Sequence, residues 1–445
     1  MESETVSVRR NQLPPGPSGK WRSTLRLIRN PRAAMEGWVK QFGDPFLLTA
    51  LNGPVIVTGR ADLIRTIHGQ DPDTYETFAT QTTAPMLGPG SMLVLFGERH
   101  RRERRMISPM FHGDRMKSYG EIMQEMALLH TRSCLSHGVV RIVDLMTDIS
   151  LDVIIRAIFG GHDRQLASQM FNASKKLVAR ANPLLFFTRK THFSCLGFSP
   201  WDRWKTARGE LCQLLDKAIK QRNRSTESHH DILTLLCEAG YEDGTPISRD
   251  DIHAELITFL FAGHETTALS MAWAIYHIHR NSHARERLLQ ELYALTDEAP
   301  ETLAAAPYLK AAIHETLRMN PIVTETLRKC RKPMQLEQYD VPVGMAVAPA
   351  TVLAHYNPDV YPEPDEFRPE RFIERSFSPF EFMPFGGGHR RCIGAPFAMY
   401  EMAMVLGVLL RNFKFELMDK EPVVPKRRSV TMGPSTDIPA RITPK

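Results

Sequence analysis

The spacing of hydrophobic and polar residues predicts helices over most of the chain. From about residue 98 to residue 204 the hydrophobic positions recur with mainly helical spacing. Another helix is expected to begin at Ser248, because Ser248 and Asp251 have the spacing of a capping box. It continues to about Asn281, a length of roughly 50 Å at about 1.5 Å per residue. A further helix is predicted from Cys392 to about Arg411.

Extended and irregular segments are shorter, and they carry many of the prolines and glycines. Prolines exclude a helix from residues 13–21. Strand-like runs are predicted at residues 45–59, with a hairpin turn at Asn52-Gly53, at residues 334–348 and, as a second hairpin, at residues 427–442. Loop-rich segments are predicted at residues 72–97 and 358–384. The pattern therefore predicts a mainly α chain with small β elements.

Length and charge narrow the possible classes of protein. A chain of 445 residues with 42% hydrophobic residues can bury a large core, and no repeat or low-complexity tract divides it. We therefore predict a polar N-terminal leader over residues 1–12 and one domain over residues 13–445. The net charge of +6 is mild and not concentrated in one patch, so no nucleic-acid binding is expected.

Cysteine spacing and hydropathy bear on the location of the protein. The six cysteines lie far apart, with no CxxC pair and no zinc-type Cys/His spacing, so neither a disulfide framework nor a structural zinc is expected. The N-terminus has no signal-peptide core, and the most apolar stretch, residues 256–278, contains His264, Glu265 and His277. These features predict a cytoplasmic protein with no membrane anchor.

One cysteine lies in unusual surroundings, the sequence FGGGHRRCIG at residues 385–394. Its glycines let the backbone approach a ligand closely. The helix predicted after Cys392 brings its positive dipole end near the sulfur, which favours a thiolate. Backbone N–H groups can donate to a metal-bound sulfur, and Arg390 and Arg391 supply positive charge for carboxylates. The stretch fits haem iron held by Cys392; a buried structural cysteine is the alternative.

This stretch resembles the cysteine-ligand signature of cytochromes P450, Phe-Gly-x-Gly-x-Arg-x-Cys-x-Gly, at every fixed position. Further motifs in the family's order extend the resemblance over nearly the whole chain. Glu315 and Arg318 resemble the family's Glu-x-x-Arg pair, and Arg371 in FRPERF resembles the third member of that cluster. The resemblance implies the P450 fold, a large α-helical domain with a small β-rich lobe, and heme b (iron protoporphyrin IX) as cofactor. It also implies a monooxygenase.

The resemblance assigns roles to residues around the haem. In FAGHETTA, Glu265 and Thr266 match the acid–alcohol pair that relays protons during oxygen activation, and Thr267 is a structural neighbour. The implied contacts with haem come from His100, which replaces the more usual Trp, and from Arg104, Arg328, Arg390, Phe385 and Ala262.

A run of arginines surrounds His100 and Arg104 on the same predicted helix. Arg99, Arg101, Arg102 and Arg105 cannot all face the haem. They form either a solvated face or a docking surface for an acidic electron donor. Because no reductase is fused after the haem region, the resemblance implies a separate ferredoxin or flavodoxin with its reductase.

The position of segments within the family predicts a substrate pocket. Its residues are Phe78, Met86, Leu87, Leu260, Val323, Thr324, Val430 and Thr431. Most of them are apolar, which favours a lipophilic substrate such as a terpenoid, a steroid or a fatty acid. The protein is expected to be a monomer. Two alternatives remain: a haem-thiolate sensor without turnover, and a peroxygenase or haem isomerase.

Overall fold

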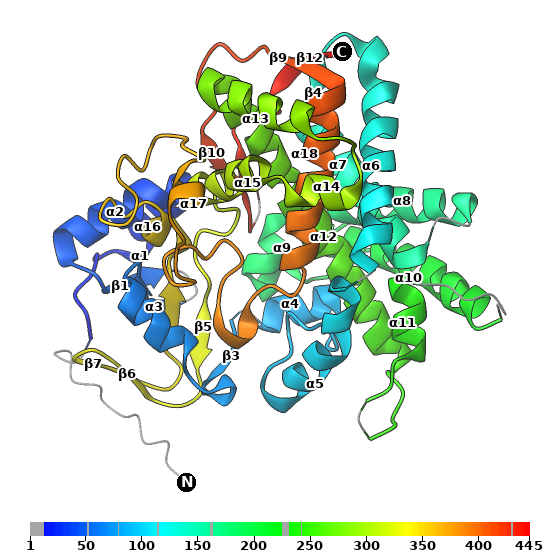
Figure 1. Ribbon diagram of the computed structural model, residues 1–445. Helices are drawn as coiled ribbons and strands as arrows, with labels where there is room; N and C mark the ends of the chain where they lie inside the picture. Colours follow the sequence, from blue (N-terminus) through cyan, green and yellow to red (C-terminus); the bar gives the residue numbers. More distant parts are fainter. Residues whose placement is uncertain are drawn as a thin grey trace.

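Helices fill one side of the molecule, and a mixed sheet with its covering helices fills the other (Figure 1). The computed structural model describes residues 13–50, 53–78, 80–113, 115–160, 163–224, 231–241, 243–428 and 430–445. The predicted leader, residues 1–12, lies outside the described residues, as does Asn52 of the predicted hairpin turn.

The α-helices are distributed along the whole described chain, and the strands lie in the connections between them or after the last helix. Their bounds are α1 Lys20–Arg29, α2 Pro31–Phe42, α3 Ala61–His68, α4 Thr80–Leu87, α5 Gly97–Ile107, α6 Arg115–Cys134, α7 Ile142–Phe159, α8 Arg164–Ala179, α9 Pro183–Phe187, α10 Pro200–Arg222, α11 Ile232–Glu238, α12 Arg249–Arg280, α13 Ser282–Ala294, α14 Pro300–Ala305, α15 Pro307–Met319, α16 Thr351–His355, α17 Arg371–Glu374 and α18 Ala395–Asn412.

Within the described ranges, the strands form four small sheets. Their bounds are β1 Phe46–Ala50, β2 Gly53–Thr58, β3 Tyr75–Thr77, β4 Val140–Arg141, β5 Arg328–Cys330, β6 Met334–Leu336, β7 Tyr339–Val341, β8 Ala346–Pro349, β9 Phe413–Leu417, β10 Pro425–Arg427, β11 Met432–Pro434 and β12 Pro439–Pro444. The largest sheet has the order β1-β2-β8-β5-β3, and only its β2–β8 pair is parallel. The others pair β4-β12-β9, β6-β7 and β10-β11.

The longest helix, α12, begins where the sequence predicted. The side chain of Ser248 accepts a hydrogen bond from the amide of Asp251 at 3.1 Å, which satisfies a free N–H group of the first turn. Asp250 and Asp251 complement the positive end of the helix dipole, and Arg280 lies in the last turn. The helix ends at Asn281, whose extended backbone starts α13.

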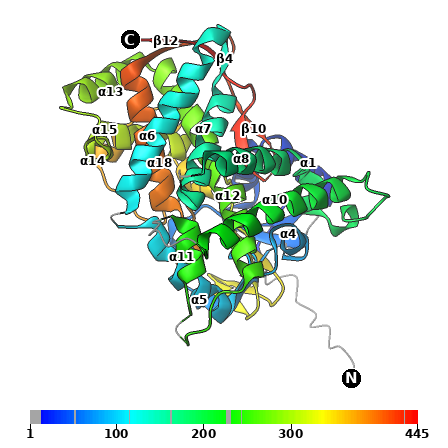
Figure 2. The ribbon, with the colours of Figure 1, turned by 90° about the vertical axis from the view of Figure 1, so that its right-hand side faces the viewer.

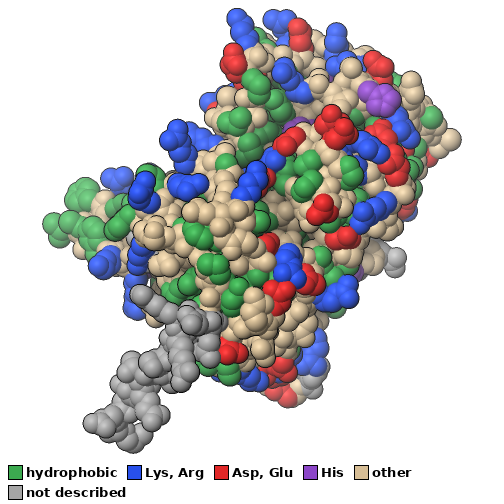
Figure 3. All heavy atoms as spheres, turned by 90° about the vertical axis from the view of Figure 1, so that its left-hand side faces the viewer, with side chains coloured by type: hydrophobic (Ala, Val, Ile, Leu, Met, Phe, Trp, Pro, Cys, Tyr) green, Lys and Arg blue, Asp and Glu red, His purple; other side chains and the backbone are tan. Residues whose placement is uncertain are grey.

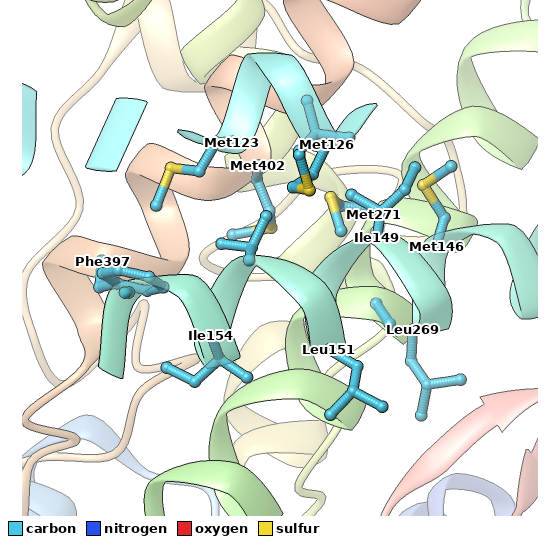
Figure 4. Packing of buried hydrophobic residues seen from close by; sticks show 14 of the residues in the cluster. Met123, Met126, Met146, Ile149, Leu151, Ile154, Leu269, Met271, Phe397 and Met402 are labelled. Atoms are coloured by element: carbon cyan, nitrogen blue, oxygen red, sulfur yellow. The ribbon is translucent and has the colours of Figure 1, made fainter. Parts of the chain in front are cut away.

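The main core lies where α12 packs against α7, and where α6 packs against α7 and α18. These four helices lie close together in both ribbon views (Figures 1 and 2). Figure 4 shows that the contact is made largely by methionine and branched aliphatic side chains, among them Met123, Met146, Ile149 and Met402. Methionine fills irregular gaps between helices, so this core suits a bundle that surrounds a cavity.

Three sequence-based boundaries were wrong in part. Residues 80–87 form α4 although Pro85 lies inside the helix, because α4 packs against α9 and α12. The N-terminal extended segment stops before Lys20, where α1 begins. The C-terminal hairpin is limited to β10 and β11, while β12 pairs with β9 and β4 instead. In each case packing between distant segments overrode the local pattern.

A buried carboxyl group in this core provides a test of stability against pH. Glu401 of α18 is fully buried, and burial raises its pKa from 4.5 to about 8, opposed weakly by the Ser150 hydroxyl. Between pH 4.5 and pH 8 the unfolded chain releases this proton while the folded chain keeps it. The free energy of unfolding should therefore fall with rising pH, by up to about 1.4 kcal/mol per pH unit.

Urea unfolding at pH 5 and pH 8 measures this effect. We expect Glu401→Gln to be less sensitive to pH than the unmodified protein, because glutamine has no proton to release. The control is Glu416→Gln, since the side chain of Glu416 is largely exposed. An equal pH dependence of the free energy of unfolding in Glu401→Gln and Glu416→Gln would show that the Glu401 carboxyl does not cause it.

Candidate active site

A cavity of about 440 Å³ is lined by both α12 and the glycine-rich segment that contains Cys392. From α12 it is lined by Phe259, Ala262, Gly263 and Thr266, among others. These positions follow one face of the helix, at spacings of three or four residues. Ala262 and Cys392 are 130 positions apart in the sequence. The two motifs that contain them therefore line the same cavity.

The segment around Cys392 is held by backbone geometry that needs glycine. Gly386 and Gly388 have φ angles of 65° and 63°, in the left-handed region that favours glycine. The amide of Cys392 donates to the carbonyl of Phe385 at 2.9 Å, which closes the loop. Cys392 lies inside the protein but lines the cavity, so its side chain is accessible from the cavity.

The predicted preference of Cys392 for thiolate is only partly present in the free protein. Burial raises the pKa of its thiol, and this is the largest effect. The backbone N–H groups of Gly394 and Ala395 and the charges of Arg104 and Arg391 act in the opposite direction. The helix terminus therefore helps, as expected from the sequence, but burial outweighs it in the free protein, and a bound metal ion would favour the thiolate.

The loop also rests on a buried histidine that sequence reasoning missed. His68, at the end of α3, is buried, and neither ring nitrogen has a hydrogen-bond partner among the described residues. Its Nδ1 lies 2.2 Å from the place that a Cβ on Gly387 would occupy. Gly387 has an extended backbone, with φ of −158°, so the space taken by His68 is the reason for glycine here.

This contact predicts a pair of compensating substitutions. Gly387→Ala should collide with the imidazole of His68, displace the loop and lower haem retention by about tenfold or more. The double variant His68→Ala/Gly387→Ala should recover part of the loss, because the ring that blocks the methyl group is gone. Haem content of the purified proteins and the carbon monoxide spectrum of the reduced proteins measure both.

Gly394→Ala is the matched control for this pair. Gly394 lies in the same segment, has φ of −81°, and has open space where its Cβ would be. We expect this variant to keep its haem. A double variant that retains no more haem than Gly387→Ala alone would show that His68 does not position the loop.

Behind the loop, the predicted ion cluster is complete and buried. Glu315 accepts from Arg318 at 2.7 and 2.9 Å and from Nε of Arg371 at 3.1 Å. The side chains of Glu315 and Arg318 are fully buried, and that of Arg371 is 4% exposed. Further hydrogen bonds, from the backbone of Arg368 to Glu315 and from both arginines to backbone carbonyls, satisfy the remaining groups.

A neutral histidine connects this cluster to the segment before the cysteine loop. Burial and the Arg318 charge lower the pKa of His355 to about 3. Its Nε2 accepts from the amide of Met383 at 2.9 Å, so Nδ1 carries the proton and donates to the carbonyl of Arg318 at 3.2 Å. The cluster and the ligand segment are therefore joined by one hydrogen-bonded side chain.

Basic residues gather at one edge of the cavity, and they include every polar residue predicted to hold haem carboxylates. His100, Arg104, Arg328 and Arg390 all line the cavity. Burial, the largest effect, lowers the pKa of Arg328 and Arg390 to about 10, and in Arg390 the charges of Arg328 and Arg104 add to it. His100 is buried too; burial, followed by the charges of Arg390 and Arg104, lowers its pKa to about 3, so its ring is neutral and can act as a hydrogen-bond donor.

These cations fit an anionic group that the cavity would hold. Arg328 donates to the carbonyl of Gly387 at 2.6 Å, but its Nε and Nη1 are buried with no partner in the part of the chain that the structure describes. Arg390 donates to Leu95 O at 2.7 Å and to Thr77 Oγ1 at 2.8 Å. Unpaired buried guanidinium donors are costly, and carboxylates are the partners that satisfy them best. The residues therefore fit haem propionates.

The other arginines of α5 are compensated within the chain. Each lies in an ion pair: Arg99 with Asp251, Arg101 with Glu98 and Asp73, Arg102 with Asp243, and Arg105 with Glu98. Much of their positive charge is thus neutralised by nearby acids. This geometry favours the solvated face over the docking surface, the two alternatives that the sequence left open.

On α12, the predicted acid and alcohol face different surroundings. Thr266 lines the cavity, and its hydroxyl donates to the carbonyl of Ala262 at 2.8 Å. Glu265 is not among the lining residues; it lies near Arg428 and Thr431, both of which lower its pKa, whereas burial raises it by more. Consecutive residues of a helix point about 100° apart, so this separation follows from the helix itself.

Of the eight predicted substrate-pocket residues, only Val323 lines this cavity. Met86, Leu87 and Leu260 are buried in the main core, and Phe78 packs against the cluster under β1 and β2. Thr324 and Thr431 are buried, and Val430 is largely exposed. The order of segments in a family does not show which face of each segment turns inward. The position of a segment was therefore not enough to decide which of its residues line the cavity, and the other seven residues do not line it.

The apolar wall of the cavity comes instead from residues that the sequence did not single out. They include Met92, Phe96, Phe111, Ile154, Phe259, Leu317 and Ile322. Phe259 could have been found, because it lies three residues before Ala262 on the same helix face. Ile154 and Phe111 come from other helices, and only the folded structure brings them to the cavity.

An accessible cysteine on a glycine-rich loop, next to unpaired cationic donors, defines a class of protein that binds haem through sulfur. Comparison with known proteins gives the family. The family model described as Cytochrome P450 matches residues 14–439. The chain belongs to the cytochrome P450 family. It is a haem-dependent monooxygenase whose cofactor is protoporphyrin IX haem, and its mainly α fold is the P450 fold, as the sequence predicted.

Individual proteins are similar over nearly their whole length. Cytochrome P450 138 of Mycobacterium tuberculosis is 32% identical over 416 residues, which cover 91% of this chain and 90% of the relative. Cytochrome P450 135B1 of the same species is 30% identical over 95% of this chain and 89% of its own. A cyanobacterial P450 solved with retinoic acid bound has a TM-score of 0.85 at 25% identity, covering 97% of this chain and 100% of that one.

Proposed function

We propose that this monooxygenase oxidises a lipophilic small molecule, in the class of terpenoids, steroids or fatty acids. The observation that carries the proposal is the apolar wall of the cavity, where Phe111, Ile154 and Phe259 line the same space as Ala262 and Thr266 of α12. Apolar walls with few polar groups bind ligands mainly by desolvation. The retinoic acid bound by the cyanobacterial relative is a ligand of similar character.

We propose that Cys392 would hold the haem iron, that Arg104, Arg328, Arg390 and His100 would bind the propionates, and that Phe385 and Ala262 would contact the ring. When bound, the haem supplies the site of dioxygen activation. The protein supplies a single thiol, a dry apolar wall and fixed positive charge at one edge. The cluster of Glu315, Arg318 and Arg371 is proposed to have a structural role.

The proposed proton path uses both residues of the acid–alcohol pair. Burial raises the pKa of Glu265, so this carboxyl holds a proton more readily than an exposed glutamate. Thr266 donates to Ala262 O, and its oxygen lone pairs are left to accept from a water in the cavity. Because Glu265 faces away from the cavity, we propose that water links the two side chains.

Thr266→Ala is expected to lower product formation by about tenfold or more relative to electrons consumed, since it removes a positioned hydroxyl from proton delivery. Product and NADPH consumption, measured with a surrogate ferredoxin and reductase, give the ratio. Thr267→Ala is the matched control, because Thr267 is the next residue and makes the same kind of bond, to Gly263 O at 3.0 Å. Equal loss in both variants would contradict a specific role for Thr266.

We further propose that electrons come from a separate ferredoxin or flavodoxin with its reductase. Residues 13–445 are proposed to form one domain, acting as a monomer in the cytoplasm. The six cysteines, all free, are consistent with a reducing compartment.

Optical titration of the purified ferric protein with fatty acids, terpenes and steroids tests the substrate class. A blue shift of the Soret band with one class, followed by an oxidised product from that class, is the expected result. A protein that binds such ligands but forms no product with any redox system would instead support a sensor. No shift with any of the three classes would overturn the lipophilic assignment.

A further inference from the structure

The loop between α4 and α5 packs directly against the first turns of α12. A Cβ on Gly90 would lie 1.9 Å from Oδ1 of Asp251, so the loop approaches the helix as closely as glycine allows. The hydroxyl of Thr258 donates to that of Ser91 at 2.7 Å, and both side chains are buried. Met92, the next residue of the loop, lines the cavity. The position of this loop on α12 therefore shapes one wall of the cavity.

A buried carboxyl group of α12 also holds this loop. Glu255 is fully buried, and its Oε1 accepts a hydrogen bond from the amide of Met92 at 2.8 Å. Its Oε2 is buried and has no hydrogen-bond partner within the described part of the chain. An ionised carboxylate in such a place is costly, whereas a protonated carboxyl group costs much less. The geometry therefore indicates that Glu255 carries a proton.

A second buried carboxyl group, that of Glu103 on α5, has the same incomplete set of partners. Its Oε1 accepts from the hydroxyl of Tyr241, and its Oε2 is buried without a partner among the described residues. Burial and next the charge of Glu103 raise the pKa of Glu255 well above its usual value. Burial also raises the pKa of Glu103, opposed by the Tyr241 hydrogen bond. Two buried carboxyl groups that repel one another do not both ionise near neutral pH.

The groups around this pair of carboxyl groups do not supply the missing positive charge. The charged and titratable groups that act on it are Tyr241, Asp251, Arg99 and Arg102. Asp251 adds repulsion, while Arg99 donates to Asp251 at 2.9 Å and Arg102 to Asp243 at 2.9 Å, so both cations are already paired. Acids on the surface differ, because water and neighbouring cations stabilise them; Figure 3 shows acidic and basic side chains beside one another on one face.

We propose that Glu103 and Glu255 share one proton, directly or across one buried water, and that this shared proton keeps the loop of Met92 closed over the cavity. It joins α5, which carries His100 and Arg104, to α12 and to the loop at the same time. Loss of the proton leaves two negative charges between the helices, and their repulsion loosens the loop. Glu103 and Glu255 are thus positioning residues for the substrate pocket. The proposal rests on the proposed function only in that a substrate enters this cavity.

The direction of the pH dependence follows from the number of bound protons. The closed loop keeps one proton that the open loop releases, because water reaches both carboxyl groups in the open form and lets them ionise. Raising the pH from the ordinary range of glutamate to the raised pKa of the pair therefore favours the open form. Over that range, each pH unit should shift the equilibrium between closed and open loop by about tenfold.

Hydrogen exchange at the Met92 amide, in the full-length haem-loaded protein without substrate, tests this proposal. We expect protection of this amide to fall by about tenfold or more from pH 5 to pH 8. In Glu255→Gln the side-chain oxygen still accepts from Met92 and the NH2 group donates to Glu103, so protection should be the same at both pH values. In Glu255→Ala the amide should be unprotected at both. The control is Glu98→Gln, also on α5 but 66% exposed, which should behave like the unmodified protein.

A second variant keeps the test decisive if Glu255→Gln does not hold its haem. In Glu103→Gln the new NH2 group donates to the Glu255 carboxylate, so Met92 should again show no pH dependence. An unchanged carbon monoxide spectrum shows that a variant is folded. Protection of Met92 that does not change with pH in the unmodified protein, or that changes equally in the glutamine variants, would overturn the proposal. Because the assay contains no substrate, its result is separate from that of the substrate titration.

Discussion

Replacing Cys392 with alanine is expected to abolish monooxygenase activity and the thiolate-type carbon monoxide spectrum. The cavity contains no other cysteine among its lining residues, and the segment from Gly386 to Gly394 brings only this sulfur to it. Burial raises the pKa of the free thiol and so favours its neutral form, and replacing a small neutral group with a methyl group leaves no buried charge without a partner. The loss of activity and of the spectrum should therefore come from removal of the sulfur ligand, while the protein stays folded.

Cys195→Ala is the matched control for this substitution. Cys195 is exposed and is not among the residues that line the cavity, although its amide donates to Asp202. This variant should keep both activity and spectrum. A Cys392→Ala protein that still gave the thiolate-type spectrum would remove the basis of the site assignment, whatever its activity.

Replacing Glu315 with glutamine is expected to destabilise the protein by about 3–5 kcal/mol. The substitution keeps the shape of the side chain but leaves Arg318 and Arg371 as buried charges without a compensating anion. Because their remaining partners are backbone carbonyls, no other carboxylate replaces Glu315 in the bonds described. Unfolding by urea, followed by circular dichroism, measures the change, and the yield of haem-loaded protein should fall with it.

The control for Glu315 is an ion pair with the same sequence spacing on the surface. Arg141 and Asp144 are also three residues apart, but their side chains are 65% and 51% exposed. Asp144→Asn should change the free energy of unfolding by less than about 1 kcal/mol. If Glu315→Gln cost no more than Asp144→Asn, burial of the cluster would not explain its role.

The sequence predicted those parts of the site that depend on local geometry. The cap at Ser248, the helix after Cys392 and the cluster of Glu315, Arg318 and Arg371 all rest on residue types at fixed spacing, and the structure brings them together as expected. The fold class and the haem cofactor followed from the same motifs. Such spacing is readable because a helix turn or a short loop fixes it.

The sequence did not predict features that depend on contacts between distant segments. His68 meets Gly387 across more than 300 positions, and nothing in the residues near His68 indicates this contact. Met86 and Leu87 were assigned to the pocket from the position of their segment within the family; as part of α4, they turn into the main core. The ion pairs of α5 arginines with Asp243 and Asp251 could not be predicted for the same reason, because they too join distant segments.

The histidine that joins the ion cluster to the ligand segment has a consequence for how the native protein opens. The amide of Met383 can exchange its hydrogen with solvent only when its bond to His355 breaks, and His355 is held by the backbone of Arg318. Exchange at Met383 should thus occur through the same opening event that exposes the Glu315 cluster. The segment that leads to Cys392 and the helix that carries the cluster then form one cooperative unit of local unfolding, with a single protection level.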